Sequence, residues 1–373
     1  MKTIFASNPQ RICDNPSSPF AYFGWPSVTR LPDGTLAMVA SGFRLKHVCP
    51  FGKGIICYSK DEGRHWTRPT VLLDTSLDDR DCGIAVFADG RVILTSFNNT
   101  LEFQKSVNER ERNAHPDEEA AHELIDAYIK ASAQMNREEA DVGSMYLLSE
   151  DGGYTFGEVR RAPITSPHGP FPALNGELLY IGRRFSANNT FDDGAQPYIE
   201  CWRLNAEDEF EFVSTIPNVS DKYGVLLSCE PHAIQLPSGK IVVHIRVQRG
   251  GERPYFTVYQ SESLDGGKSF SPPIRLLSEK GGSPAHLMLH SSGVLISTYG
   301  YRESPYGIRV MFSKDEGVTW DTDYVLSADG ESGDLGYPAT VELNDGSLLT
   351  VYYQKIGRES VILQRTWRVP DSI

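Results

Sequence analysis

SKDEGVTW, residues 313–320, decides the fold, because it follows the pattern S-x-D-x-G-x-[T/S]-[W/F] and the chain carries that pattern four times. The other copies of this motif, the Asp-box, are SKDEGRHW (59–66), SEDGGYTF (149–156) and SLDGGKSF (263–270). We expect the Asp to accept backbone N–H groups in a turn and the final aromatic ring to be buried between sheets. The four aspartates are therefore interpreted as turn residues without a catalytic role: Asp61, Asp151, Asp265 and Asp315.

A second repeated feature is a turn that ends in Gly and lies between two β-rich runs. The six turns are LPDG, FADG, ALNG, LPSG, HSSG and LNDG, which end at Gly34, Gly90, Gly176, Gly239, Gly293 and Gly346. Asn, Asp or Ser followed by Gly favours a tight turn between antiparallel strands. The turns recur mostly every 53 to 63 residues, which is typical of propeller blades.

These two repeats predict an all-β fold, a six-bladed β-propeller formed by residues 1–373 as a single domain. The run TIFAS (3–7) is expected to complete the last blade beside VILQRTW (361–367). One turn interval is longer than the others, and it predicts a helical insertion at 101–142, in or after the first hairpin of the second blade.

Within the insertion, the sequence predicts a helix over 117–135, after Pro116 and with acidic residues in its first turn. Leu124, Tyr128, Ala131 and Met135 are expected to share one face of that helix. Three interpretations stay open: a contact between subunits of a homo-oligomer, a lid over the ligand site, or a helix with neither role.

Composition excludes several classes of protein. The 373 residues are 40% hydrophobic and 23% charged, which is ordinary for a globular chain. A formal net charge of −13 argues against nucleic acid and anionic membrane as partners. No apolar run is long enough for a signal peptide or a membrane span, so we expect a cytoplasmic protein. The six cysteines lack paired spacing and are expected to be reduced core residues, and no motif predicts a metal or a cofactor.

Equal offsets from the turn glycines should mark equivalent positions on the inner strands. Nine residues before the six glycines lie, in order, Trp25, Asp81, Pro167, Glu230, Pro284 and Tyr337. The strand after each turn returns to the same face and brings arginines there: Arg44, Arg183 or Arg184, Arg246 and Arg302. We therefore predict a ligand site at one mouth of the propeller axis.

The Asp-boxes, together with SCEPHAIQLPSGKIVVHIR (228–246) and LGYPATVELNDGSLLTVYY (335–353), resemble the sialidase superfamily of six-bladed propellers. The resemblance implies that Tyr337 attacks the anomeric carbon after Glu230 takes its proton, because a phenol is a poor nucleophile without a base. It also implies an arginine clamp on a substrate carboxylate, with Arg246 and Arg302 as members and Arg309 as the rival of Arg302.

The chain departs from the family pattern at two places. Gly24 stands where the first clamp arginine belongs, and no carboxylate lies between Arg44 and Lys60, where the family has its general acid. His47 is the titratable substitute in that loop, and Asp79 or Asp81 of the run DDRD (78–81) is the preferred acid. Further substrate contacts are predicted for four residues: Trp25, Arg44, Arg80 and His232.

For each of these residues a structural role is the alternative interpretation. Glu230 and Tyr337 would then form a hydrogen bond in the channel, DDRD a strand-entry turn, and Arg44, Arg183 and Arg184 solvated rim charges. His168 and His232 are slightly favoured as channel histidines whose hydrogen bonds are satisfied.

The sequence thus predicts a glycoside hydrolase that acts on a terminal, acidic sugar of an oligosaccharide or glycoconjugate. One alternative is a lyase or another exo-glycosidase that acts on uronate-containing or rhamnose-linked sugars. A propeller that binds carbohydrate without catalysis is the other.

Overall fold

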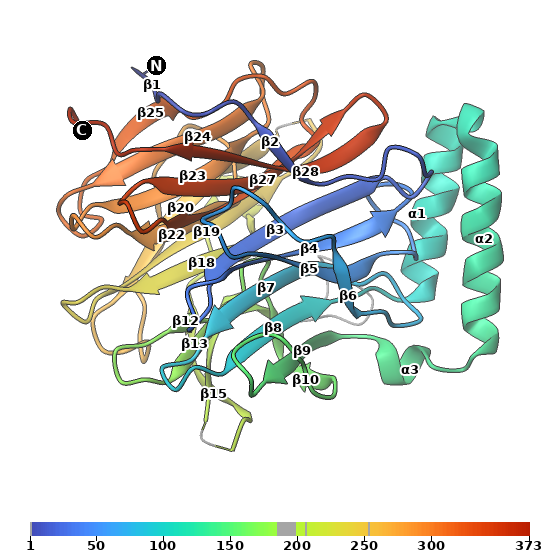
Figure 1. Ribbon diagram of the computed structural model, residues 1–373, viewed down its shortest axis with the longest axis horizontal. Coiled ribbons are helices and arrows are strands. Elements are labelled where there is room, and N and C mark those ends of the chain that lie inside the picture. Colours follow the sequence, from blue (N-terminus) through green and yellow to red (C-terminus); the bar gives the residue numbers. More distant parts are fainter. Residues whose placement is uncertain (1, 185–198, 206, 253) are drawn as a thin grey trace.

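The protein, described here by a computed structural model over residues 2–184, 199–205, 207–252 and 254–373, has an all-β propeller fold with a helical insertion (Figure 1). The first antiparallel unit contains β3 (Tyr22–Arg30), β4 (Leu36–Arg44), β5 (Lys53–Ser59) and β6 (Thr70–Leu73). The second contains β7 (Arg80–Val86), β8 (Val92–Phe97), β9 (Ser144–Ser149) and β10 (Arg160–Ala162). The third contains β11 (Ile164–Thr165), β12 (Phe171–Pro172), β13 (Leu178–Arg184), β14 (Ile199–Leu204) and β15 (Phe210–Ile216).

The second half of the chain repeats this arrangement. After the short hairpin of β16 (Ser220–Asp221) and β17 (Gly224–Val225) come β18 (Leu227–Gln235), β19 (Ile241–Arg249), β20 (Tyr255–Ser263) and β21 (Ile274–Arg275). The next sheet contains β22 (Ala285–Leu289), β23 (Leu295–Tyr301), β24 (Gly307–Ser313), β25 (Asp321–Val325) and the N-terminal β1 (Lys2–Thr3). The last strands are β26 (Leu335–Glu342), β27 (Leu348–Ile356) and β28 (Glu359–Trp367), with β2 (Gln10–Cys13) beside β28.

The innermost strands contact one another in a closed ring. Contacts join β3 to β7, β7 to β12, β12 to β18, β18 to β22, β22 to β26, and β26 back to β3. A single parallel pair, Ser360 with Tyr22, also links β28 to β3, so the first and last units share one sheet. Buried side chains fill the spaces between neighbouring sheets, where the hydrophobic effect stabilises the ring.

The six predicted turns are confirmed, because each turn Gly has a positive φ, between 73° and 92°, and lies between two consecutive strands of one unit. The aspartates of the Asp-boxes accept backbone N–H groups as predicted, whereas the final aromatic rings are only partly buried against the core. In the copy at 313–320, Asp315 accepts hydrogen bonds from the Thr319 backbone N–H at 2.9 Å and the Thr319 hydroxyl at 2.6 Å. These bonds lower the pKa of Asp315 to about 2, so its carboxylate is ionised and committed to the turn.

The prediction for the N-terminal strand is confirmed only in part. Residues 2–3 pair with β25, and β2, not the run TIFAS, forms the strand beside β28. The end of TIFAS does lie beside β28, because Ala6 forms an antiparallel bridge with Trp367 and the Ser7 backbone N–H donates to the Thr366 carbonyl at 2.8 Å. Local sequence favours an extended run there, but the pairing partner depends on how the ring closes.

Helices occupy the chain between β8 and β9: α1 (Leu101–Ala114), the 3-10 turn η1 (Pro116–Glu118), α2 (Glu119–Gln134) and α3 (Glu138–Asp141) (Figure 1). The predicted helix corresponds to α2, whereas α1 was missed because LEFQKSVNERERNA is mostly polar and buries only four residues. The residues predicted to share one face of this helix are not its buried ones. Leu124 and Met135 are 42% and 54% exposed, while Ile125 is the buried apolar residue of α2.

Three further expectations concern the described residues. All six cysteines are free and buried, as predicted. In the described part of the chain, no group of His, Cys, Asp and Glu side chains is arranged to hold a metal ion. No helix there is long and apolar enough to cross a bilayer.

Candidate active site

Four of the six equivalent inner-strand positions share an unusual backbone conformation. Trp25, Asp81, Glu230 and Tyr337 have φ values of 55°, 46°, 47° and 48°, and each lies where the register of its inner strand is interrupted. A positive φ is costly for residues with a Cβ, and such strain clusters at functional sites. Proline occupies the other two positions, where its ring fixes a negative φ.

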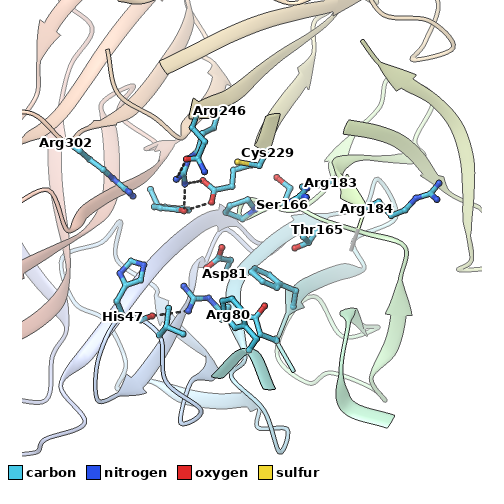
Figure 2. A pocket seen from close by; sticks show the side chains of 18 residues that line it. His47, Arg80, Asp81, Thr165, Ser166, Arg183, Arg184, Cys229, Arg246 and Arg302 are labelled. Atoms are coloured by element: carbon cyan, nitrogen blue, oxygen red, sulfur yellow. Dashed lines mark hydrogen bonds and ion pairs between the residues drawn. The ribbon is translucent and has the colours of Figure 1, made fainter. Parts of the chain in front are cut away.

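A cavity of about 310 Å³ opens where these strands begin (Figure 2). Of the predicted site residues, the structure brings seven to its wall: His47, Arg80, Asp81, Glu230, Arg246, Arg302 and Tyr337. Arg183 and Arg184, left as alternatives by the sequence, both line it as well. Equal offsets from the turn glycines therefore predicted residues that line one cavity, Asp81, Glu230 and Tyr337 among them.

Tyr337 and Glu230 form the centre of the cavity. The Tyr337 hydroxyl donates to Glu230 Oε1 at 2.7 Å, and Arg246 Nη1 lies 2.5 Å from Glu230 Oε2 and 3.1 Å from the Tyr337 hydroxyl. Burial, followed by the charge of Glu230, raises the pKa of Tyr337 well above its ordinary value. The phenol is thus neutral at rest, with a base already hydrogen-bonded to its proton and a guanidinium placed to stabilise the oxyanion.

The cavity wall is strongly cationic although the protein is acidic. Five arginines line it against two carboxylates, Asp81 and Glu230. Arg246 is fixed by Gln248, which accepts from its Nε at 2.8 Å, and Arg302 by the Leu335 carbonyl, which accepts from its Nε at 3.0 Å. Arg302 Nη2 is buried and has no hydrogen-bond partner in the described structure, so it can still bind a ligand oxygen. This surplus of guanidinium groups favours an anionic ligand.

Asp81 is suited to donate a proton. Burial raises its pKa to about 7, with Arg80 opposing and Glu230 reinforcing the shift. Its Oδ1 is buried without a hydrogen-bond partner among the described residues. A carboxyl group that is half protonated near neutral pH and reaches the cavity is a candidate general acid.

His47 lies beside Arg80, which donates to its carbonyl at 3.0 Å, and its ring is held by polar partners. Its Nδ1 is 2.7 Å from the Tyr22 hydroxyl and 3.1 Å from Asp334 Oδ1, which also accepts from Tyr22 at 2.8 Å and from Tyr353 at 3.0 Å. Burial lowers the pKa of His47. The contacts at Nδ1 fix the direction of the ring.

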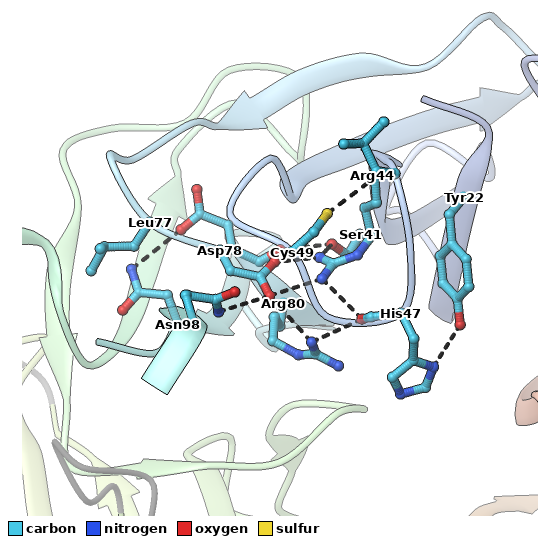
Figure 3. A network of polar contacts seen from close by, with 12 residues as sticks. Tyr22, Ser41, Arg44, His47, Cys49, Leu77, Asp78, Arg80 and Asn98 are labelled. Carbon is cyan, nitrogen blue, oxygen red and sulfur yellow. Dashed lines mark hydrogen bonds and ion pairs between the residues drawn. The ribbon is translucent and has the colours of Figure 1, made fainter. Parts of the chain in front are cut away.

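Two predicted residues belong to a buried network instead of the cavity wall (Figure 3). Arg44 is completely buried and pairs with Asp78 at 2.6 Å, so it is not a substrate-binding residue. Asp79 is also completely buried and accepts from the Thr75 backbone at 2.7 Å and the Thr75 hydroxyl at 2.8 Å. The prediction of Asp79 as an acid is corrected to a turn-holding role, which leaves Asp81.

Three other predicted contacts lie outside the cavity. Arg309 donates to the carbonyls of Ser327 at 2.6 Å and Pro305 at 2.8 Å. Of the two alternatives, Arg302 and not Arg309 lines the cavity. The His232 ring accepts from the Leu287 backbone at 2.8 Å and stacks on His286. Trp25 is 1% exposed, and the Arg80 guanidinium lies 4.3 Å from its ring centre, so Trp25 supports Arg80.

Sequence analysis missed several wall residues, among them Phe97, Asn99, Phe103 and Gln248. Gln248 could have been found, because it lies two residues after Arg246 on β19 and strand alternation places both on one face. Phe103 could not, since it comes from the unpredicted helix α1.

Comparisons with known proteins agree with this geometry. The sequence model of the BNR repeat-like domain family matches residues 104–350. A search of curated proteins finds no match.

Among solved structures, a protein of unknown function from Dyadobacter fermentans is similar, with 19% identity, a TM-score of 0.72, and 98% of this chain and 99% of that chain covered. The Trypanosoma rangeli sialidase in complex with the inhibitor DANA shares 13% identity at a TM-score of 0.62, and the match covers 92% of this chain and 55% of the sialidase. The Penicillium chrysogenum alpha-L-arabinanase complexed with arabinobiose shares 15% identity at 0.62, with 98% of both chains covered. At these identities the likeness concerns the fold alone, and the family match shows that the chain belongs to the BNR repeat-like domain family.

Proposed function

We propose that this protein is a glycoside hydrolase that releases a terminal acidic sugar from an oligosaccharide, on a propeller of six blades. The closed ring of six innermost strands supports the blade number. The observation that carries the function is the 2.7 Å hydrogen bond from Tyr337 to Glu230 beside Arg246, inside a cavity rich in arginine.

In the first step, Tyr337 Oη attacks the anomeric carbon while Glu230 takes the phenol proton. The glycosidic C–O bond breaks, and Asp81 protonates the leaving oxygen. Arg246 stabilises negative charge that develops on the phenol oxygen, since its Nη1 lies 3.1 Å away. A neutral nucleophile also avoids repulsion with a carboxylate on the sugar.

In the second step, water attacks the anomeric carbon after giving a proton to the Asp81 carboxylate. The bond to Tyr337 breaks, and Glu230 returns the proton to the phenol. Asp81 therefore alternates between acid and base, which suits a group whose pKa is about 7.

The arginines support an acidic substrate. Arg302 and Arg246 flank the Tyr337–Glu230 pair, and Arg80 and Arg183 add charge across the cavity. Arg80, Arg184 and Arg246 pair with Asp78, Glu200 and Glu230, whereas Arg302 Nη2 has no hydrogen-bond partner among the described residues. A sugar carboxylate would therefore be bound first by Arg302, with bidentate geometry where two guanidinium nitrogens face it.

An NMR time course tests the proposal, with a pooled set of sialylated and uronate-capped oligosaccharides as substrates. We expect the wild type to release a capping sugar and Tyr337→Phe to release none while keeping its fold. Tyr352→Phe is the matched control, because Tyr352 is also completely buried and its hydroxyl is hydrogen-bonded, to Arg365, outside the cavity. Full turnover by Tyr337→Phe would refute the assignment of Tyr337 as the nucleophile.

A uronate lyase is the second candidate, because the contact of Arg246 with the Tyr337 hydroxyl would equally stabilise a phenolate that acts as a base. The same spectra distinguish it, since a lyase product has vinyl protons and a hydrolase product has none. Binding of a glycan without turnover by the wild type would instead support a propeller that binds carbohydrate without catalysis.

A further inference from the structure

A second, larger hollow adjoins the cavity, and its role is not explained by the reaction above. This groove, of about 1210 Å³, lies between the helical insertion and the β27–β28 hairpin. His47 and Val48 line both the groove and the cavity. The cavity and the groove therefore adjoin at these two residues.

The helices form a fixed wall of this groove. Lys46 pairs with Glu118 at 2.7 Å, and Gln104 of α1, which is 1% exposed, donates to Asp78 at 3.2 Å. The rings of Phe51 and Tyr128 are 4.5 Å apart. These contacts bind the insertion to the first two sheets at several points. The insertion is thus better suited to shape a binding site than to close over one as a lid.

The charges of the two hollows differ. The cavity has five arginines against two carboxylates, whereas the groove has equal numbers of Lys or Arg and of carboxylates. The groove cations are Arg11, Lys46, Arg110, Lys355 and Arg358, and the groove acids are Glu111, Asp117, Glu118, Asp334 and Glu359. A polyanionic chain would meet those carboxylates, while neutral hydroxyl groups can both donate and accept along such a wall.

We propose that the groove binds the leaving-group side of the substrate, a short chain of neutral sugars, with the acidic cap in the cavity and the scissile bond near His47. This inference rests on the proposed function. If the cavity holds one sugar, the roughly fourfold larger groove has room for a short oligosaccharide. This chain of neutral sugars is called the stem below. The insertion would then determine which stems the enzyme accepts.

Two substitutions on the same helix test the groove. Ala121 of α2 lines it, so Ala121→Trp should fill part of it. Ala131 is an exposed residue of α2 outside the groove, so Ala131→Trp is the matched control. Both are made in the Tyr337→Phe background, which keeps the substrate intact, and thermal unfolding verifies that they fold alike.

The measurement is saturation-transfer-difference NMR with acid-capped oligosaccharides that carry neutral stems of one to four sugars, and with the matching methyl glycosides. We expect saturation of cap and stem protons, and loss of the stem signals in Ala121→Trp but not in Ala131→Trp. Saturation of the cap alone, or stem signals unchanged by Ala121→Trp, would overturn the groove inference and leave the proposed function standing. Binding of no glycan would count against both.

Kinetics on the otherwise wild-type enzyme give a second readout. We expect kcat/KM to be about tenfold higher for a long-stem substrate than for the methyl glycoside, and this advantage to disappear in Ala121→Trp. Activity on the methyl glycoside should stay the same in both variants. Equal kcat/KM for all stem lengths would contradict the inference.

Discussion

Two clusters of arginine, carboxylate and hydroxyl groups lie at the same mouth of the propeller, and only one of them faces the cavity. In the first, Arg246 contacts Glu230 and Tyr337, and the Arg246 and Glu230 side chains are 13% and 20% exposed. In the second, Arg44 contacts Asp78 and Ser41, and both charged side chains are 0% exposed. The residue types are alike, so access to the cavity is what distinguishes the first cluster, the proposed reaction centre, from the second, which holds loops in place.

The largest expected effect is on turnover in the first cluster. Glu230→Gln keeps a hydrogen-bond acceptor for Tyr337 but removes the base, so we expect kcat to fall by roughly 10²- to 10⁴-fold. Steady-state kinetics on the substrate found by NMR measure kcat, and urea unfolding verifies that the variant keeps its stability. A variant with normal kcat would place the Glu230–Tyr337 pair with the structural cluster.

In the second cluster the effect should be on stability. Asp78→Ala leaves the buried Arg44 without its carboxylate, and we expect the free energy of unfolding to fall by about 3 to 5 kcal/mol. Urea denaturation measures this loss. The control is Glu109→Ala, which breaks an exposed pair with Lys105 on α1 and should cost less than about 1 kcal/mol. Equal losses in the two variants would contradict the comparison.

The neighbouring acids Asp79 and Asp81 should differ in what their titration changes: Asp81 should affect activity, and Asp79 should affect stability. Burial raises the pKa of Asp81 to about 7, and an acid loses its proton as the pH rises through its pKa. Activity should therefore decline above about pH 7, and Asp81→Asn should lower kcat and abolish this alkaline decline. His47→Gln is the control that should keep it. An alkaline decline that vanishes with His47→Gln instead would make His47 the acid.

Asp79 should affect stability through the same titration. Burial raises its pKa from 3.8 to about 7, so between these values the native state holds a proton that the unfolded state has released. Stability from this group is therefore greatest at low pH and falls as the pH rises from about 4 to 7. Asp79→Asn should flatten that part of a plot of unfolding free energy against pH, and an unchanged slope would argue against a protonated Asp79.

The smallest effect is expected at an Asp-box. Asp315→Ala removes the acceptor of the Thr319 backbone and hydroxyl hydrogen bonds, which should cost roughly 1 kcal/mol and leave kcat unchanged. Thermal unfolding tests the predicted loss of stability, and the NMR assay tests the predicted unchanged turnover. Loss of activity without loss of stability would show that the box contributes to the chemistry.

Particular residues show why some predictions failed. Arg302 and Arg309 both lie near the fifth turn in the sequence, but the Arg309 guanidinium donates its hydrogen bonds to the carbonyls of Pro305 and Ser327. Asp79 and Asp81 have the same side chain and similar sequence surroundings, yet the register interruption on β7 leaves only Asp81 at the cavity. Such differences depend on partners that are distant in the chain, and residue type does not reveal them.

The sequence by itself determined the turns, the Asp-boxes and the equivalent positions of Asp81, Glu230 and Tyr337, because each depends on short-range backbone geometry that recurs at fixed offsets. Tertiary structure alone decided which arginines reach the cavity, where the N-terminal strand pairs, and how the unpredicted helix α1 helps to build a groove. Those outcomes follow from closure of the ring, which sets burial and assigns partners across hundreds of residues.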